Sequence, residues 1–272
     1  MIKKLFRPTP QVIPQYEEDF YHHPGTIPGT LNIDKDAAET KVSLIDYNQN
    51  QVTPKKISIP EDCANYLDTE SVSWVDVQGL GNTIILQEIG KVFELHPLVL
   101  EDVVNVPERP KIEDYEDQLV IISRMVMPTE NNNGFDSEQV SFVLGKNYRL
   151  TVQEKPTFDC FGPVRLRIRN NKGIIRKQGA DYLAYALLDA IIDGFFLVLE
   201  DYGERIEGLE EEVIVNPTRK TLQKIYRIRR ELLQLRRAIW PQRSAINSLI
   251  RDSNELITEE VRIYLRDCYD HA

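Results

Sequence analysis

Two adjacent carboxylates, Glu101 and Asp102, are the residues whose types and setting best suit binding chemistry. They close an apolar run within His96–Lys111, HPLVLEDVVNVPERPK, where Pro97 suits the first turn of a helix because its missing N–H costs nothing there. Neighbouring residues on a helix point about 100° apart, so at least one of the two carboxylates projects outward. Carboxylate oxygens suit hard cations such as Mg²⁺ and Ca²⁺, and Mg²⁺ keeps most of its waters, so one or two carboxylates per chain are enough. The residues alone leave a solvated helix end as the alternative.

A second group of possible ligands lies at the end of the chain, where Asp267, Asp270 and His271 are spaced three and four residues apart. On a helix this spacing places carboxylate and imidazole on one face, a donor set that could bind Co²⁺, Ni²⁺ or Zn²⁺. The three cysteines are far apart and form no CxxC pair, which predicts reduced cytosolic thiols. No spacing suggests a Ser/His/Asp or Cys/His set, and no paired acids mark a glycosidase or protease, so we expect no enzyme.

Composition predicts an acidic globular protein. Its 272 residues are 42% hydrophobic and 28% charged, which is ordinary for a chain with a sizeable core. The net charge of −10 argues against a nucleic-acid partner and favours bound cations. The first ten residues hold two lysines but no apolar core, so no signal peptide is expected. Apolar runs such as Phe195–Leu199 fall short of the roughly 18 residues that a membrane span requires, so none is predicted.

The carboxylate pair belongs to a predicted α/β domain over residues 37–170, which follows an irregular, proline-rich lead-in over residues 1–36. Apolar patterning predicts strands at 42–47, 52–59, 72–77, 119–126, 140–144 and 148–153. Helical spacing predicts a helix over 83–93, while 165–169 fits a short helix or a solvated surface equally well. The fold class is therefore α/β (α+β), a mixed sheet with flanking helices.

A long antiparallel helical hairpin is predicted over residues 171–257, with its break at Asn216–Thr218. Glu200–Glu212 carries seven acids and one base, whereas Arg219–Arg243 carries nine bases and one acid, so the two helices have complementary charge. The basic run lacks interleaved exposed aromatic residues, so nucleic-acid binding is not expected. The second helix should be kinked at Pro241. Its apolar stripe, expected to matter more than the charges, consists of Leu222, Ile225, Ile228, Leu232, Leu235 and Ile239.

Six segments resemble the cytoplasmic domain of the CorA family of magnesium transporters and occur in family order. They are residues 96–111, SEQVS at 137–141, NNKGIIRK at 170–177, ADYL at 180–183, IWP at 239–241 and RDCYDH at 266–271. The first 70 residues match loosely, chiefly through Pro28-Gly29-Thr30. The resemblance implies the soluble part of a homopentameric channel for Mg²⁺, Co²⁺ and Ni²⁺ on the cytoplasmic face of the cell membrane.

The resemblance also implies that a last helix over residues 258–272, capped by Thr258, begins a stalk that continues into membrane spans beyond this sequence. It places an inter-subunit regulatory Mg²⁺ site on Asp102 and Asp267, and a looser site on Glu101 and Asp189, in which Co²⁺ or Ni²⁺ could substitute. Binding of the ion would favour the closed ring. For Asp189 a capped or solvated helix acid fits equally well. A zinc-transporting branch of the family, a cytosolic metal-dependent hydrolase and a metal-independent helical scaffold are the alternatives.

Overall fold

The computed structural model describes residues 27–129, 134–156 and 159–272. Seven strands form one sheet in the order β2-β1-β3-β7-β6-β5-β4, in which β3 and β7 are parallel and the other neighbours antiparallel. The strands are β1 (Lys41–Tyr47), β2 (Val52–Ile57), β3 (Val72–Gln78), β4 (Lys111–Tyr115), β5 (Gln118–Pro128), β6 (Phe135–Leu144) and β7 (Tyr148–Gln153). The helices are η1 (Pro60–Tyr66), α1 (Thr83–Val92), α2 (Pro97–Val104), α3 (Gly162–Arg169), η2 (Ile175–Lys177), α4 (Ala180–Val215), α5 (Arg219–Arg251) and α6 (Glu259–His271). The mixed α/β class predicted from the sequence is confirmed.

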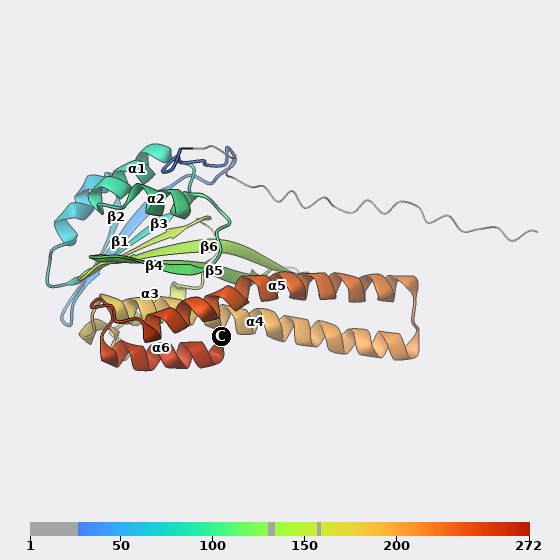
Figure 1. The fold of residues 1–272 in the computed structure, drawn as a ribbon. Coiled ribbons are helices and arrows are strands. Elements are labelled where there is room, and N and C mark those ends of the chain that lie inside the picture. The colour runs from blue at the N-terminus through green and yellow to red at the C-terminus, as the bar shows by residue number, and fades with distance from the viewer. Residues whose placement is uncertain (1–26, 130–133, 157–158) are drawn as a thin grey trace, which may run out of the picture.

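Helices cover both faces of the sheet, with α1 and α2 on one face and α3, α4, α5 and α6 on the other (Figure 1). Strand β5 shows the consequence, since Leu119 and Ile121 belong to the core under α4 while Val120 and Ile122 belong to the core under α1 and α2. Strand β4, which reads KIEDY, was not predicted because it is a half-exposed edge strand without apolar alternation.

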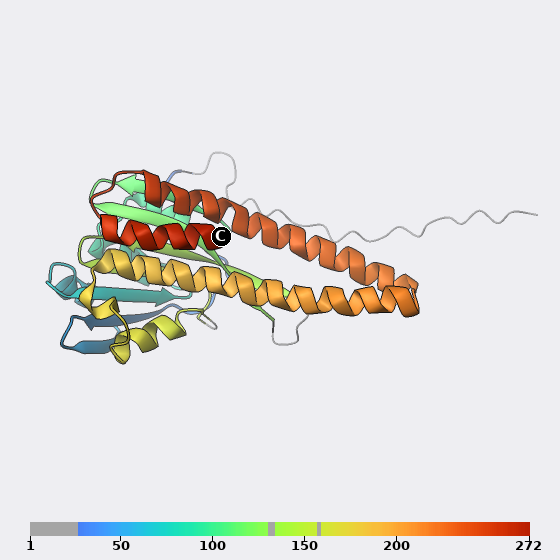
Figure 2. The ribbon, with the colours of Figure 1, turned by 90° about the horizontal axis from the view of Figure 1, so that it is seen from below.

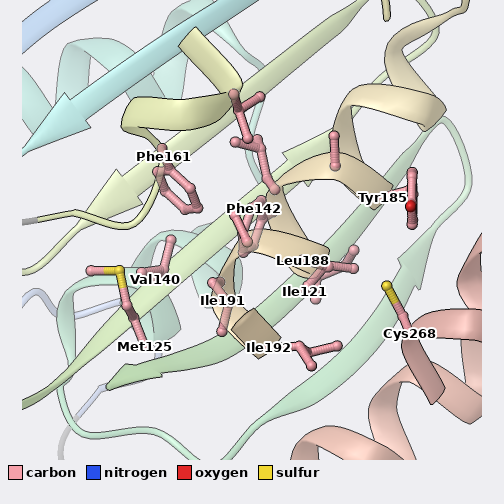
Figure 3. Packing of buried hydrophobic residues seen from close by; sticks show 14 of the residues in the cluster. Ile121, Met125, Val140, Phe142, Phe161, Tyr185, Leu188, Ile191, Ile192 and Cys268 are labelled. Carbon is pink, nitrogen blue, oxygen red and sulfur yellow. The ribbon is translucent and has the colours of Figure 1, made fainter. Parts of the chain in front are cut away.

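The core on the hairpin side joins the sheet to the first half of α4. Figure 3 shows Phe142, Phe161 and Ile191 converging between β6 and α4, and the rings of Phe142 and Phe161 meet edge to face at 6.2 Å. The first half of α4 therefore packs into the core of the sheet, and its second half forms one arm of the helical hairpin. The division at residue 170 between an α/β domain and a hairpin stays a prediction.

Helix α4 is long and apolar enough, by length and composition, to cross a membrane, which the expectation based on unbroken apolar runs did not recognise. Most of its apolar window is buried inside the protein, because the sheet lies on one side and α6 on another (Figures 1 and 2). The apolar window of α4 thus matches a helix segment that is buried in the protein core.

The distal half of the hairpin extends beyond the sheet (Figure 2), and the apolar stripe of α5 is only partly covered there. Ile228 and Leu235 are buried, but Leu222 and Ile225 are 51% and 40% exposed, and Leu232 is half-buried. The expectation of a packed stripe therefore fails at its outer end, because α4 alone faces α5 there. Side chains of both helices line an open groove of about 670 Å³, among them Ile206, Leu209, Val213, Ile225, Ile228 and Leu232.

Charged contacts between the hairpin helices follow the predicted pairing in part. Glu212 of α4 pairs with Lys224 of α5 at 2.7 Å, but Glu231, the one acid of the basic run, pairs with Arg205, the one base of the acidic run, at 2.8 Å. Helix α5 carries Pro241 in its interior and bends along its course in Figure 1.

Candidate metal-binding site

Helix α2 carries the adjacent carboxylates and is fixed at both ends. Its N-cap His96 accepts a hydrogen bond from the Leu98 N–H through Nδ1 at 3.2 Å, and Pro97 occupies the first turn as predicted. Val99 and Val103 lie in the core under the helix. Glu101 and Asp102 lie between these valines in the sequence but point away from this core in two different directions. The two carboxylates therefore have different surroundings.

Asp102 projects toward the surface but is already paired with a cation of the chain. Its Oδ2 lies 2.6 Å from Nζ of Lys111, which also contacts Oε1 of Glu113 at 3.1 Å. The Asp102 side chain is 19% exposed. Burial lowers the pKa of Lys111, but hydrogen bonds to Asp102 and Glu113 outweigh it, so the pKa lies above its ordinary value. The ammonium group therefore occupies one of the two oxygens of this carboxylate.

Gln139, from the SEQVS segment, holds the end of α2 in place. Its side chain is buried, donates through Nε2 to the Asp102 carbonyl oxygen at 2.9 Å, and accepts the Glu108 N–H through Oε1 at 2.7 Å. Sequence reasoning missed this positioning residue, although a glutamine inside a strand of buried residues was a signal for it.

Glu101 is buried and has a structural partner. Its Oε2 accepts the Gly29 N–H at 2.5 Å, which fastens the Pro28-Gly29-Thr30 segment to α2. Gly29 has a φ of +83°, and a Cβ there would lie 3.0 Å from Cβ of Pro97, so this close approach requires glycine. Asp189 lies on α4, across the sheet, so one chain does not bring Glu101 and Asp189 together (Figure 1).

Asp189 and Asp267 do lie near each other, on α4 and α6. Oδ1 of Asp189 accepts a weak hydrogen bond from the Cys268 thiol at 3.6 Å, and the Asp267 side chain is 64% exposed. Burial and then the charge of Asp193 raise the pKa of Asp189, the Cys268 thiol and Arg167 lower it less, and the charge of Asp267 adds the smallest raising contribution. This surface is therefore rich in carboxylates that repel one another, a setting that a divalent cation would relieve.

Asp270 and His271 end α6 at the surface. His271 Nδ1 lies 4.0 Å from Oδ2 of Asp267, at the limit of an ion pair, and Asp270 is exposed. Across residues 27–129, 134–156 and 159–272, no three or more His, Cys, Asp or Glu side chains stand close enough to hold a metal. The terminal cluster suggested by spacing is therefore not preassembled as a three-ligand site.

The two principal carboxylates lie on opposite faces of the fold. Asp102 lies on α2 above the sheet, and Asp267 lies on α6 beneath it (Figure 1). Each is accessible and presents oxygen ligands, but neither forms a complete site. An ion that uses both must therefore join two copies of the chain.

Comparison with known proteins identifies the fold and the family. The solved soluble domain of CorA from Methanocaldococcus jannaschii has the same fold, with a TM-score of 0.68 over 85% of this chain and 87% of that chain at 19% identity. The cytoplasmic domain of ZntB from Vibrio parahaemolyticus matches with a TM-score of 0.65 over 86% of this chain and 88% of that one at 15% identity. The fold of this chain is therefore the fold of these two solved domains.

The family described as CorA-like Mg²⁺ transporter protein matches residues 69–272, and the chain belongs to this family. The cobalt/magnesium transport protein CorA of Thermotoga maritima is 41% identical over 249 residues, which cover 91% of this chain and 71% of that protein. The family resemblance inferred from the sequence segments is thereby confirmed.

Proposed function

We propose that this chain is the Mg²⁺-sensing domain of a homopentameric channel for Mg²⁺, Co²⁺ and Ni²⁺, on the cytoplasmic face of the inner membrane. Family membership supports the transport function, and the relatives are named as transporters. The observation that supports sensing is that Asp102 and Asp267 lie on opposite faces of the fold, so that only neighbouring copies could bring both carboxylates to one ion.

The donor chemistry fits Mg²⁺. Asp102 of one copy and Asp267 of the next would each offer a carboxylate oxygen to one hydrated ion, with Asp189 beside Asp267 adding negative charge. The ion would supply charge neutralisation between the two faces. Lys111 would have to yield part of its hold on Asp102, so that binding is weak, on the order of millimolar as for loosely built cation sites. Glu101, held by Gly29, would orient α2 and contribute charge from behind.

Protection from protease by Mg²⁺ tests this assignment. Asp102→Asn and Asp267→Asn should each abolish most of the protection, and the double variant should be scarcely worse because both act through one shared ion. Asp68→Asn, which removes an exposed carboxylate elsewhere, serves as the control. A Mg²⁺ protection curve unchanged in both single variants would rule out this site.

The second candidate function is that of the cytoplasmic domain of a zinc-transporting member of the family. The likeness to the ZntB cytoplasmic domain and the imidazole of His271 beside Asp267 favour it. Protection by Zn²⁺ that His271→Gln removes, with no protection by Mg²⁺, would support this alternative. A cytosolic metal-dependent hydrolase gains no support, because the described part of the chain assembles no three-ligand metal cluster.

A further inference from the structure

An open cleft of about 1090 Å³ separates the middle of α5 from the segment that links α2 to β4. Its floor includes Arg124 of β5 and Ser137 of β6. Residues from α5 form one wall, and residues 107–110 form the other. The cleft lies apart from Asp102 and Asp267, which do not line it.

The lining is strongly basic, with four arginines, Arg109, Arg124, Arg236 and Arg237, and one acid, Glu108. In the part of the chain that the structure describes, no carboxylate lies within ion-pair distance of any of these four guanidinium groups. Arg236 and Arg237 are exposed on α5. Unpaired guanidinium groups that converge on one hollow are the donors that recognise phosphate in proteins.

Arg124 carries the strongest sign of a missing anion. Its Nε and Nη2 both donate to Ser137 Oγ, at 3.3 and 2.9 Å, while Nη1 is buried and has no acceptor among the described residues. Burial lowers the pKa of Arg124, against the raising charges of Glu154 and Glu138. A buried donor without a partner is costly, and an anion in the cleft would remove that cost.

The walls of the cleft are held rigidly. Gln242 of α5 is buried, and its Oε1 accepts from Ser123 Oγ at 2.9 Å and from the Arg124 N–H at 3.1 Å, which fixes α5 on β5. On the opposite wall, Gln139 holds the Glu108 N–H. Preorganised walls reduce the ordering cost of binding a ligand.

An aromatic side chain stands beside the arginines. Trp240 is 61% exposed, and the guanidinium group of Arg236 lies 5.2 Å from its ring centroid. Phe135, Leu233, Pro107, Pro110 and Pro241 add apolar lining. A flat apolar surface next to several guanidinium groups matches a ligand with a planar ring at one end and several phosphates at the other.

We propose that this cleft binds a nucleoside polyphosphate, with its phosphates on Arg124, Arg236 and Arg237 and its base against Trp240. The ligand would contact both α5 and the segment that follows α2. The proposal goes beyond cation sensing and does not depend on it, because the donors are cationic and no divalent ion is needed.

Fluorescence of Trp240 provides the test, since the other tryptophan, Trp74, is 1% exposed. Titration with ATP in EDTA should quench the emission saturably. Arg236→Gln and Arg237→Gln should each weaken binding by about tenfold, as expected for loss of one charge-assisted hydrogen bond. Arg230→Gln removes the same charge from an exposed position of α5 outside the cleft and should leave the affinity unchanged.

Two further ligands separate the parts of the proposal. Tripolyphosphate should compete with ATP, but it should bind more weakly and should not quench the Trp240 emission. Adenosine alone should give no saturable quenching. Absence of saturable quenching by ATP would overturn the proposal, as would equal weakening by Arg230→Gln, which would indicate unspecific attraction. Competition by tripolyphosphate as strong as binding of ATP itself would overturn the assignment of the base to Trp240.

Discussion

Replacing Lys111 with methionine should tighten divalent-cation binding at Asp102. Nζ of Lys111 lies 2.6 Å from Oδ2 of Asp102 and 3.1 Å from Oε1 of Glu113, so the ammonium group competes with any ion for these oxygens. Methionine keeps an unbranched stem of similar length and removes the charge. The carboxylate that the ion needs is then free.

The magnitude follows from the burial of the pair. The side chains of Lys111 and Asp102 are 31% and 19% exposed, between a surface pair and a buried one. Two unit charges about 4 Å apart attract by about 1 kcal/mol in water and about 4 kcal/mol near a protein surface, before desolvation and ordering costs are subtracted. We therefore assign about 1–2 kcal/mol to the competition, which corresponds to an affinity about 5- to 30-fold tighter.

The assay is the Mg²⁺ concentration at the midpoint of protection from protease. For Lys111→Met this midpoint should fall by about 5- to 30-fold. Lys146→Met removes the charge of an exposed lysine in the turn between β6 and β7 and should leave the midpoint where it is in the wild type. A midpoint that does not move in Lys111→Met, or that moves equally in both variants, would refute the competition.

Three further predictions concern stability, measured by urea unfolding. Burial and the charge of Glu154 raise the pKa of Glu138 from 4.5 to about 8, so its ionisation costs stability as pH rises through that window. Between pH 6 and pH 8, the free energy of unfolding of Glu138→Gln should therefore fall by about 2 kcal/mol less than that of the wild type. An equal fall in both proteins would show that Glu138 does not titrate there. Leu235→Ala should cost about 2–5 kcal/mol and half-buried Leu232→Ala roughly half as much, and the reverse order would contradict the packing of α5. Thr258→Ala should cost about 1–2 kcal/mol, since Thr258 caps α6 and donates to Asp181 at 2.7 Å, and Thr258→Ser should recover most of it.

Elements with strong periodicity could be predicted from the sequence, and those decided by distant contacts could not. Residues 180–215 show helical spacing throughout, and they form α4. Arg165–Arg169 fitted two interpretations, and the structure makes it part of α3 because Arg165 reaches Asp76 at 2.7 Å and Asp159 at 2.6 Å. Asp76 is 89 residues away along the chain, so no local pattern contains this pair.

The features of the candidate site likewise divide into those that local sequence predicts and those that distant contacts decide. Helix geometry predicted that at least one of Glu101 and Asp102 points outward, but not which one. The pairing of Asp102 with Lys111 crosses a proline-containing segment whose path the sequence does not specify. The role of Glu101 as a ligand of a looser site stays a prediction, but its hydrogen bond from Gly29, 72 residues away, could not be foreseen from local sequence.

The surroundings of Asp102 and Asp267 differ in charge, and this difference bears on how an ion shared by both would act. Asp102 is largely neutralised by Lys111, whereas Asp267 lies beside Asp189 on a surface rich in carboxylates. Without an ion, repulsion between neighbouring copies would come mainly from the carboxylates around Asp267 on α6. Lys111 of the facing copy would offer these carboxylates only a weak positive charge, because it is already paired with Asp102. Loss of Asp102 would release Lys111 toward Asp267 of the neighbouring copy, whereas loss of Asp267 would leave Lys111 bound as before. If both carboxylates share one ion, Asp102→Asn and Asp267→Asn would each remove it but leave Lys111 in different positions. Some metal-independent association is therefore expected only of Asp102→Asn.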